Sequence, residues 1–132
     1  MTPMNNKIIS SWVRQARYRA KSNKIYTDLM VEDVQEIIQY FNNKCVYCGV
    51  EATCFDHPFP LKTSAPNVPA NTVPCCKPCR NNKKVNDIVW MFSKGFMTQE
   101  RYLATAKYLL ALRGGDDIKK FFQKATGIEE DV

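Results

Sequence analysis

Four of the six cysteines form two Cys-x-x-Cys pairs whose spacing suits a metal ion. Cys45 and Cys48 make the first pair, Cys76 and Cys79 make the second, and 27 residues separate the pairs. Each pair is long enough to turn the chain and aim two sulfurs at one ion, and two pairs supply the thiolates of a tetrahedral structural zinc site. Gly49 follows the first pair, where a sharp turn favours a residue that tolerates positive φ. The spacing therefore predicts a structural Zn²⁺ held by these four cysteines.

Two further cysteines, Cys54 and Cys75, stand outside this set. Cys75 directly precedes Cys76, so a site that uses Cys75 in place of Cys76 stays open, although its Cys-x-x-x-Cys spacing is less usual. The expected role of both spare cysteines is that of a small buried apolar residue.

The single histidine, His57, directly follows Asp56 between the two cysteine pairs. A carboxylate oxygen is a ligand for a hard divalent cation, and an imidazole accepts a proton near neutral pH. Pro58 and Pro60 stiffen the following chain, and Asn71 comes fourteen residues after His57. This combination sets a candidate metal ligand beside a candidate proton acceptor, whereas a lone histidine in a purely structural role is the alternative.

Three stretches and one lysine carry a resemblance to a known family. They are Cys45-Val-Tyr-Cys48-Gly49, Phe55 to Leu61 (FDHPFPL), Asn71 to Cys79 (NTVPCCKPC), and Lys83. They resemble the zinc-containing branch of the HNH endonuclease family, which is built on the ββα-metal motif. The match covers residues 45–84, and the Arg-rich segment that precedes it is similar to the helical lead-in of small phage and bacterial members.

The resemblance implies a fold, an activity and cofactors. The fold is α+β and mostly helical, with a small ββα-metal core that carries the zinc knuckles and is flanked by N-terminal and C-terminal helices. The activity is hydrolysis of DNA phosphodiester bonds with a catalytic Mg²⁺ or Mn²⁺, beside the structural Zn²⁺. Asp56 matches the metal-binding acidic residue, His57 the general base, and Asn71 the asparagine that fixes the loop and orients the histidine.

The chain departs from the family at the third HNH position. That residue usually follows the last cysteine directly and supplies the second metal ligand, but Arg80 stands there. Asn81 is the preferred substitute ligand, and Asn82 is a weaker version of the same hypothesis. Alternatively Arg80 occupies the ligand position, where its permanent cation repels a divalent metal.

The charge of the chain favours a polyanionic partner. The net charge is +6, the isoelectric point is near 9.0, and the segment from Lys7 to Lys24 holds six cationic residues and no acidic one. We expect DNA, most simply double-stranded, to contact this segment and the region after the last cysteine, although a solvated basic face is the alternative. The expected DNA-binding residues are Arg14, Arg17, Arg19, Lys21, Arg80, Lys83 and Lys84.

Hydrophobic periodicity and turn residues predict one compact domain with three segments. They are a basic and amphipathic helical segment at 1–42, the zinc-containing core at 43–95 and a helical extension at 96–132. Helices are expected over 8–22, 31–42, from Pro78 to about Lys94, over 99–112 and from Asp116 onward. The first strand is expected at Thr53–Asp56, and 62–70 is expected to be a loop.

Several classes of protein are disfavoured. No apolar run approaches the ~20 residues of a membrane span, and the N-terminus lacks the apolar stretch of a signal peptide. The expected location is therefore cytoplasmic. The resemblance implies a bacterial source, with a phage gene as one origin, and a homodimer is left open. The main rival hypothesis is a non-catalytic zinc-knuckle DNA-binding module derived from an HNH nuclease. A nuclease directed at RNA ranks below both.

Overall fold

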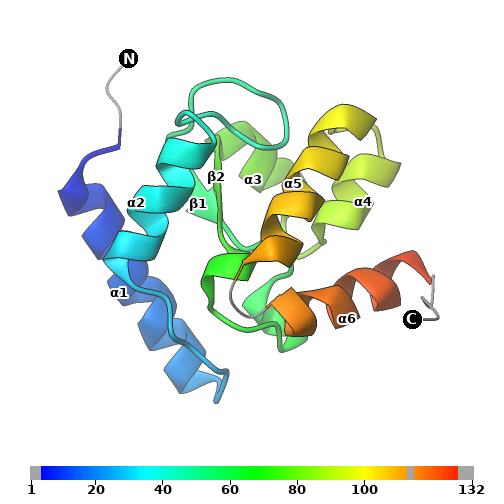
Figure 1. Cartoon of the computed structure of the whole chain (residues 1–132). Helices are drawn as coiled ribbons and strands as arrows, with labels where there is room; N and C mark the ends of the chain where they lie inside the picture. The colour runs from blue at the N-terminus through cyan, green and yellow to red at the C-terminus, as the bar shows by residue number, and fades with distance from the viewer. Residues whose placement is uncertain (1–3, 113–114, 128–132) are drawn as a thin grey trace.

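The computed structural model describes residues 4–112 and 115–127 (Figure 1). Within these ranges the chain is α+β and mostly helical, as the sequence predicts. The helices are α1 (Asn6–Ser22), α2 (Val31–Tyr40), α3 (Lys77–Lys83), α4 (Ile88–Ser93), α5 (Gln99–Ala111) and α6 (Gly115–Thr126). The strands are β1 (Cys54–Asp56) and β2 (Val73–Cys75), and two short 3₁₀ turns are η1 (Leu61–Thr63) and η2 (Pro69–Asn71). None of the helices in these ranges combines the length and apolar character that a bilayer crossing requires.

The two strands form one antiparallel pair, and α3 follows the second strand closely. Cys54 lies opposite Cys75, Phe55 opposite Pro74, and Asp56 opposite Val73. The observed β1 lies within the expected strand at 53–56. Proline is tolerated at position 74 because a two-stranded sheet has only edge strands. Because Cys54 at the start of β1 lies opposite Cys75 at the end of β2, α3 begins beside the start of β1. The last residue of α3, Lys83, reaches Asp56 at the end of β1.

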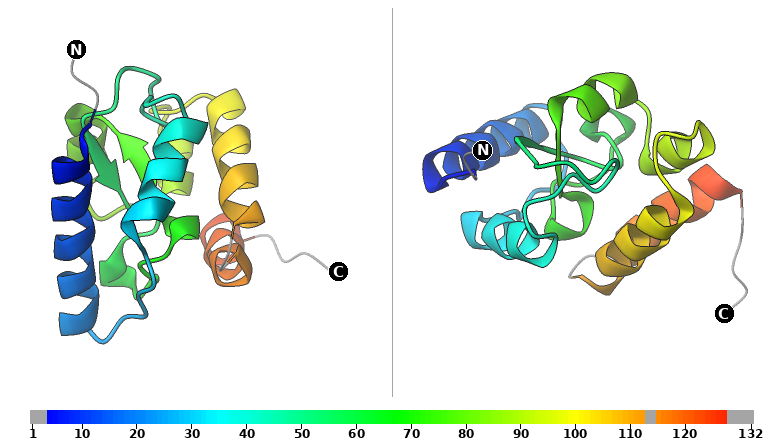
Figure 2. Two further views of the ribbon diagram at one scale, coloured as in Figure 1. Left: turned by 60° about the vertical axis from the view of Figure 1, so that its left-hand side comes forward. Right: turned by 90° about the horizontal axis from the view of Figure 1, so that it is seen from above.

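Helices α1 and α2 pack on one side of the strand pair (Figure 2). The side chain of Asn5 accepts a hydrogen bond from Ile8 N at 3.0 Å and so begins α1, while Asp33 accepts from Met30 N at 2.9 Å at the start of α2. Their apolar faces bury a cluster that includes Val13, Val34 and Phe55. This packing fixes α1 against the strand that leads to His57.

Helices α4, α5 and α6 lie on the other side of the molecule (Figures 1 and 2). Thr98 caps α5 as predicted, since its hydroxyl accepts a hydrogen bond from Arg101 N at 3.2 Å. The ring of Phe122 in α6 meets Phe59 edge-on, with 4.8 Å between ring centroids. The C-terminal helices therefore bury the segment that follows His57.

The single helix expected from Pro78 to about Lys94 is wrong. The chain forms two short helices, because Lys84 has a φ of +52° and ends α3. The side chain of Asn86 donates to Lys83 O at 3.1 Å, and Asp87 starts α4 by accepting from Trp90 N at 2.8 Å. This local capping outweighs the apolar run that suggested continuity.

The loop expected at 62–70 also differs from the prediction, because its second half is interior. Residues 65–71 are all buried, and η1 and η2 occupy the two ends of the segment. Asn71 is fully buried and bonds the backbone of Phe59 on both sides, accepting from N at 2.9 Å and donating to O at 2.8 Å. It also donates to Pro66 O at 2.9 Å. These bonds satisfy the buried backbone of an irregular segment.

Candidate functional site

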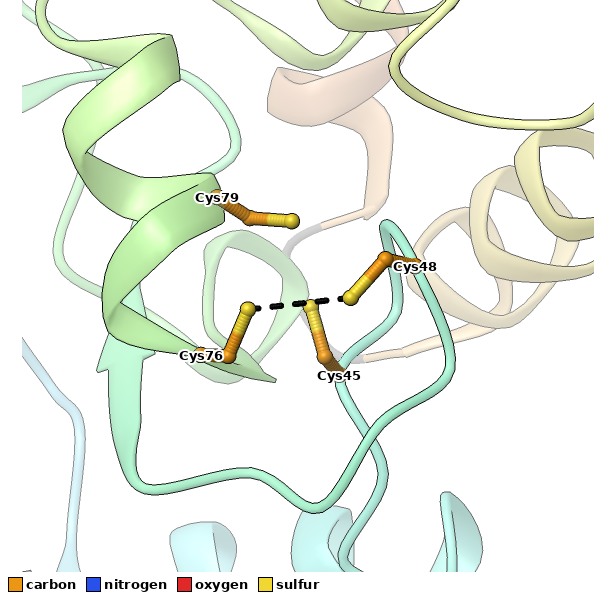
Figure 3. A group of neighbouring side chains, drawn as sticks. All are labelled: Cys45, Cys48, Cys76 and Cys79. Carbon is orange, nitrogen blue, oxygen red and sulfur yellow. Dashed lines mark hydrogen bonds between the residues drawn. The ribbon is translucent and has the colours of Figure 1, made fainter.

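The four sulfurs of the two Cys-x-x-Cys pairs converge at one point (Figure 3). All four lie within 4.8 Å of one another, and the Sγ atoms of Cys48 and Cys76 are 3.6 Å apart. A tetrahedral zinc ion with Zn–S bonds of about 2.3 Å holds its sulfurs about 3.8 Å apart. The donor set and its spacing therefore fit structural zinc. Among the described residues, no other group of three or more His, Cys, Asp or Glu side chains is arranged to hold an ion.

The cage joins a loop to a helix. Cys45 and Cys48 come from the turn after α2, whereas Cys76 caps α3 and Cys79 lies in the first turn of that helix. Cys75 is not part of the group, so the structure selects the frame that uses Cys76. Burial raises the pKa of Cys45 to about 11 and also raises the pKa of Cys79, so these thiols hold protons that an ion must displace.

The imidazole of His57 is anchored by Asn67, whose role the sequence pattern does not indicate. His57 Nε2 lies 2.8 Å from Asn67 Oδ1, and Asn67 Nδ2 donates to Thr27 Oγ1 at 2.9 Å. Because the amide nitrogen of Asn67 is used on Thr27, its oxygen faces His57, and Nε2 carries the imidazole proton. Within the described residues no hydrogen bond reaches Nδ1. That nitrogen is therefore left with a free lone pair.

His57 is neutral at pH 7. Its side chain is 7% exposed, and burial lowers its pKa from 6.5 to about 4. The cations of Arg19 and Lys83 lower the pKa further, whereas the hydrogen bond to Asn67 and the charge of Asp56 oppose them. A neutral imidazole with an unprotonated Nδ1 has the form that a general base needs.

Helix α1 forms one wall of the cavity beside His57. The ring of Trp12 lies over the imidazole at a centroid distance of 5.1 Å and an angle of 36°. The cavity has a volume of about 760 Å³, and a second cavity of about 490 Å³ adjoins it, since both are lined by Arg19, Asp56, His57 and Arg80. The other lining residues of the larger cavity are Trp12, Arg14, Gln15, Tyr18 and Phe55. We call the two cavities together the basic pocket.

Asp56 is already engaged by the protein. Its Oδ2 accepts a hydrogen bond from the hydroxyl of Tyr47 at 2.7 Å and lies 3.1 Å from Nζ of Lys83. Lys83 also donates to His57 O at 2.9 Å and is only 1% exposed. Lys83 lines the smaller cavity but its ammonium is buried against Asp56, so its expected contact with DNA stays a prediction. Tyr47 belongs to the first Cys-x-x-Cys pair, so it links the cysteine cage directly to this carboxylate.

The structure places Arg80, not Asn81, beside Asp56 and His57. Arg80 lines both cavities of the basic pocket, whereas Asn81 and Asn82 are exposed on α3 and line neither. The expected second metal ligand is thus missing. Asp56 also has one oxygen committed to two donors, with three cationic side chains around it. These residues do not fit a preformed Mg²⁺ or Mn²⁺ site, because guanidinium and ammonium groups repel a divalent cation.

The resemblance assigns both loop fixation and histidine orientation to Asn71, but the structure distributes these two roles over Asn71 and Asn67. Asn71 fixes the loop, as expected, through its three bonds to backbone atoms. Asn67, however, is the residue that bonds His57. The only sequence signal for Asn67 is an amide within a proline-rich segment, and that signal is weak. Trp12 and Tyr47 also contribute to the site without having been assigned to it.

The remaining basic residues expected to bind DNA occupy different places. Arg14 and Arg19 line the larger cavity, and Lys84 lines the smaller one. Arg17 is half-buried and donates to Leu29 O at 3.2 Å, so it ties α1 to the segment before α2. Lys21 is exposed and lines neither cavity.

No protein-family model matches this chain, and neither a curated protein sequence nor a solved structure matches it.

Proposed function

We propose that the protein binds the DNA backbone in the basic pocket and hydrolyses a phosphodiester bond, with His57 as general base. The observation that carries this proposal is the state of His57, whose Nε2 is anchored to Asn67 while Nδ1 bonds no residue that the structure describes. The resemblance to zinc-containing HNH endonucleases points the same way. The resemblance supports the proposal most strongly over residues 45–79, where the four cysteines, Asp56, His57 and Asn71 all match the family pattern.

The chemistry assigned to this chain's residues is simple. His57 Nδ1 takes a proton from water, the water oxygen bonds to phosphorus, and the bond from phosphorus to the 3′ oxygen breaks. General-base assistance of this kind contributes on the order of 10²–10⁴ in rate. Arg19 and Arg80 lie where their charges neutralise the phosphate oxygens as negative charge builds up. No step is assigned to a divalent ion.

A second candidate function is a DNA-binding module that has lost cleavage. Two observations favour it, namely Arg80 at the position of a metal ligand and the pairing of Asp56 with Lys83. Both candidates share the same phosphate-binding pocket, so binding alone does not separate them. Cleavage separates them.

The test is plasmid cleavage by the zinc-loaded protein and by a His57→Ala variant, each with EDTA or with added Mg²⁺. Zinc content is measured in the same samples, because a chelator can strip the cysteine cage. We expect nicking by the wild type that is lost in His57→Ala. Absence of cleavage under every condition would favour the binding module. Cleavage that requires Mg²⁺ while zinc is retained would contradict the ion-free assignment and restore a metal to the pocket.

Phosphate binding is tested separately through its salt dependence. Each phosphate contact contributes about −0.9 to the slope of log K against log salt concentration on B-DNA. Arg80→Ala is expected to weaken binding and reduce the magnitude of this slope by about one contact. Lys107→Ala is the matched control, since Lys107 is exposed on α5 and lines neither cavity. An Arg80→Ala slope equal to that of the control would remove Arg80 from the phosphate site.

A further inference from the structure

The two cysteines outside the zinc cage face each other across the strand pair. Cys54 in β1 lies directly opposite Cys75 in β2, and their Sγ atoms are 3.3 Å apart. Side chains that are directly opposed in an antiparallel pair project from the same face of the sheet. The short contact between the sulfurs is therefore imposed by the register of the strands, not by a chance rotamer of a loop residue.

Directly opposed strand residues are spaced in the range that a disulfide spans. Opposed residues in antiparallel strands have Cα atoms about 4.5–5.5 Å apart. Disulfides span Cα separations of about 4.4–6.8 Å, with an S–S bond of about 2.05 Å. The two sulfurs thus need to approach by little more than about 1 Å for a bond to form.

The pair is distinct from the four metal-binding thiols. Neither Cys54 nor Cys75 belongs to the group of sulfurs that converges on the zinc position. A bound zinc ion holds the other four thiols and shields them, so in the zinc-loaded protein the pair is the dithiol that stays free to react. Cys54 is 7% exposed and Cys75 is 0% exposed. Only a small oxidant reaches this site, and it meets Cys54 first.

We propose that Cys54 and Cys75 form a redox-active dithiol, which hydrogen peroxide converts into a cross-strand disulfide while the zinc cage stays intact. The Cys54 thiolate attacks one peroxide oxygen, which gives a sulfenic acid and releases hydroxide that leaves as water. The Cys75 sulfur then attacks the Cys54 sulfur and expels its hydroxyl group as a second water. In total, two thiols and one peroxide give one disulfide and two waters. A thiol reductant reverses the change.

A disulfide between Cys54 and Cys75 would lie between the cysteine cage and the basic pocket. Asp56 lies two residues after Cys54, and the zinc ligand Cys76 directly follows Cys75. A disulfide between them covalently locks the end of the strand pair that joins the cage to the basic pocket. Oxidation is therefore expected to stiffen the hairpin without releasing the metal.

The experiment treats zinc-loaded full-length protein with limiting hydrogen peroxide and maps its cysteines by peptide mass spectrometry, with zinc measured in parallel. The expected product has lost two hydrogens, links Cys54 to Cys75, retains zinc and returns to the dithiol with reductant. Cys54→Ser and Cys75→Ser are each expected to abolish this product. If either variant fails to fold, the wild-type map alone decides. Zinc release with bonds among the cage cysteines, or irreversible oxidation of Cys54 beside a free Cys75, would overturn the proposal.

Discussion

The imidazole Nε2 of His57 lies 2.8 Å from the amide oxygen of Asn67, and this contact sets the proton position on the ring. Asn67 is itself held from both sides, since its backbone N donates to Tyr26 O at 2.9 Å and its O accepts from Asp28 N at 3.1 Å. The segment before α2 thus supports the amide that supports the histidine. A base positioned in this way is pre-oriented before any substrate arrives.

The titration of His57 is the most direct check of its environment. Because the chain has a single histidine, its NMR signals need no assignment by mutation. The expected pKa is about 4 instead of 6.5, mainly because of burial. The folded pKa lies below the unfolded one, so the contribution to stability is complete above the unfolded pKa and is lost as pH falls toward 4. A shift of this size corresponds to about 3 kcal/mol. A titration midpoint near 6.5 in folded protein would contradict the buried, neutral histidine.

Replacing the amide by a carboxylate tests the Asn67 contact. In Asn67→Asp a negative charge faces Nε2, which favours the imidazolium form, so the pKa of His57 is expected to rise well above its wild-type value. The acid limb of any cleavage profile should rise with it. Asn82→Asp is the matched control, because Asn82 is exposed on α3 and lines neither cavity. Equal shifts in the two variants would mean that Asn67 acts only through general charge.

The sequence predicts those features of the fold and of the site that depend on residues close together in the chain. Each Cys-x-x-Cys pair brings two ligands together by itself, so only the meeting of the two pairs had to be inferred. The start of α5 at Thr98 and the apolar face of α2 were likewise readable from short spacings. The sequence predicts one helix in place of α3 and α4, because the apolar run after Asp87 favours a continuous helix. Asn86 and Asp87 are good capping residues, and they are the signal that indicates the break.

The pocket was harder to predict because its contacts are distant in sequence. Asn67 bonds Thr27, which is 40 positions away, and Lys83 bonds the carbonyl of His57, which is 26 positions away. Lys83 stands beside Lys84 and three positions after Arg80, so the sequence indicates a surface cation until the buried partner of Lys83 is known. For the same reason, only the three-dimensional arrangement distinguishes Arg80 from Asn81 at the pocket.

Replacing the buried Lys83 is expected to lower the free energy of unfolding. In Lys83→Met, the carboxylate of Asp56 loses its counter-ion while it remains largely buried, and breaking such a pair destabilises a protein by about 3–5 kcal/mol. Lys84→Met changes the exposed neighbour and should stay within about 0.5 kcal/mol. Urea denaturation of the three proteins measures the difference. Adding Asp56→Asn to Lys83→Met should recover part of the loss, and a lack of coupling between them would contradict the pairing.

Zinc removal should unfold the centre of the molecule, since three of the four ligands, Cys45, Cys76 and Cys79, lie within the larger buried cluster. Affinity should fall as pH is lowered, because the raised pKa values of Cys45 and Cys79 make protons strong competitors for the sulfurs. Competition with a chromogenic chelator at about pH 6 and about pH 8 measures this dependence. Cys54→Ser should bind zinc as the wild type does, whereas Cys48→Ser should not. Equal loss in both would place Cys54 in the cage.

Comparing Gly49→Ala with Gly95→Ala distinguishes the cost of backbone strain from the cost of steric overlap. Gly49 has a φ of +87° and Gly95 a φ of +81°, so alanine at either position incurs a left-handed backbone cost of roughly 1–2 kcal/mol. At Gly95 nothing lies within 4 Å of an added Cβ, whereas at Gly49 the Cβ would overlap the guanidinium of Arg101. The overlapping group is the end of a flexible, exposed side chain that can swing away at little cost, so Gly49→Ala and Gly95→Ala are expected to lower the melting temperature by similar amounts. A much larger loss in Gly49→Ala that Arg101→Ala restores would contradict this expectation and show that Arg101 is held rigidly against the first Cys-x-x-Cys turn.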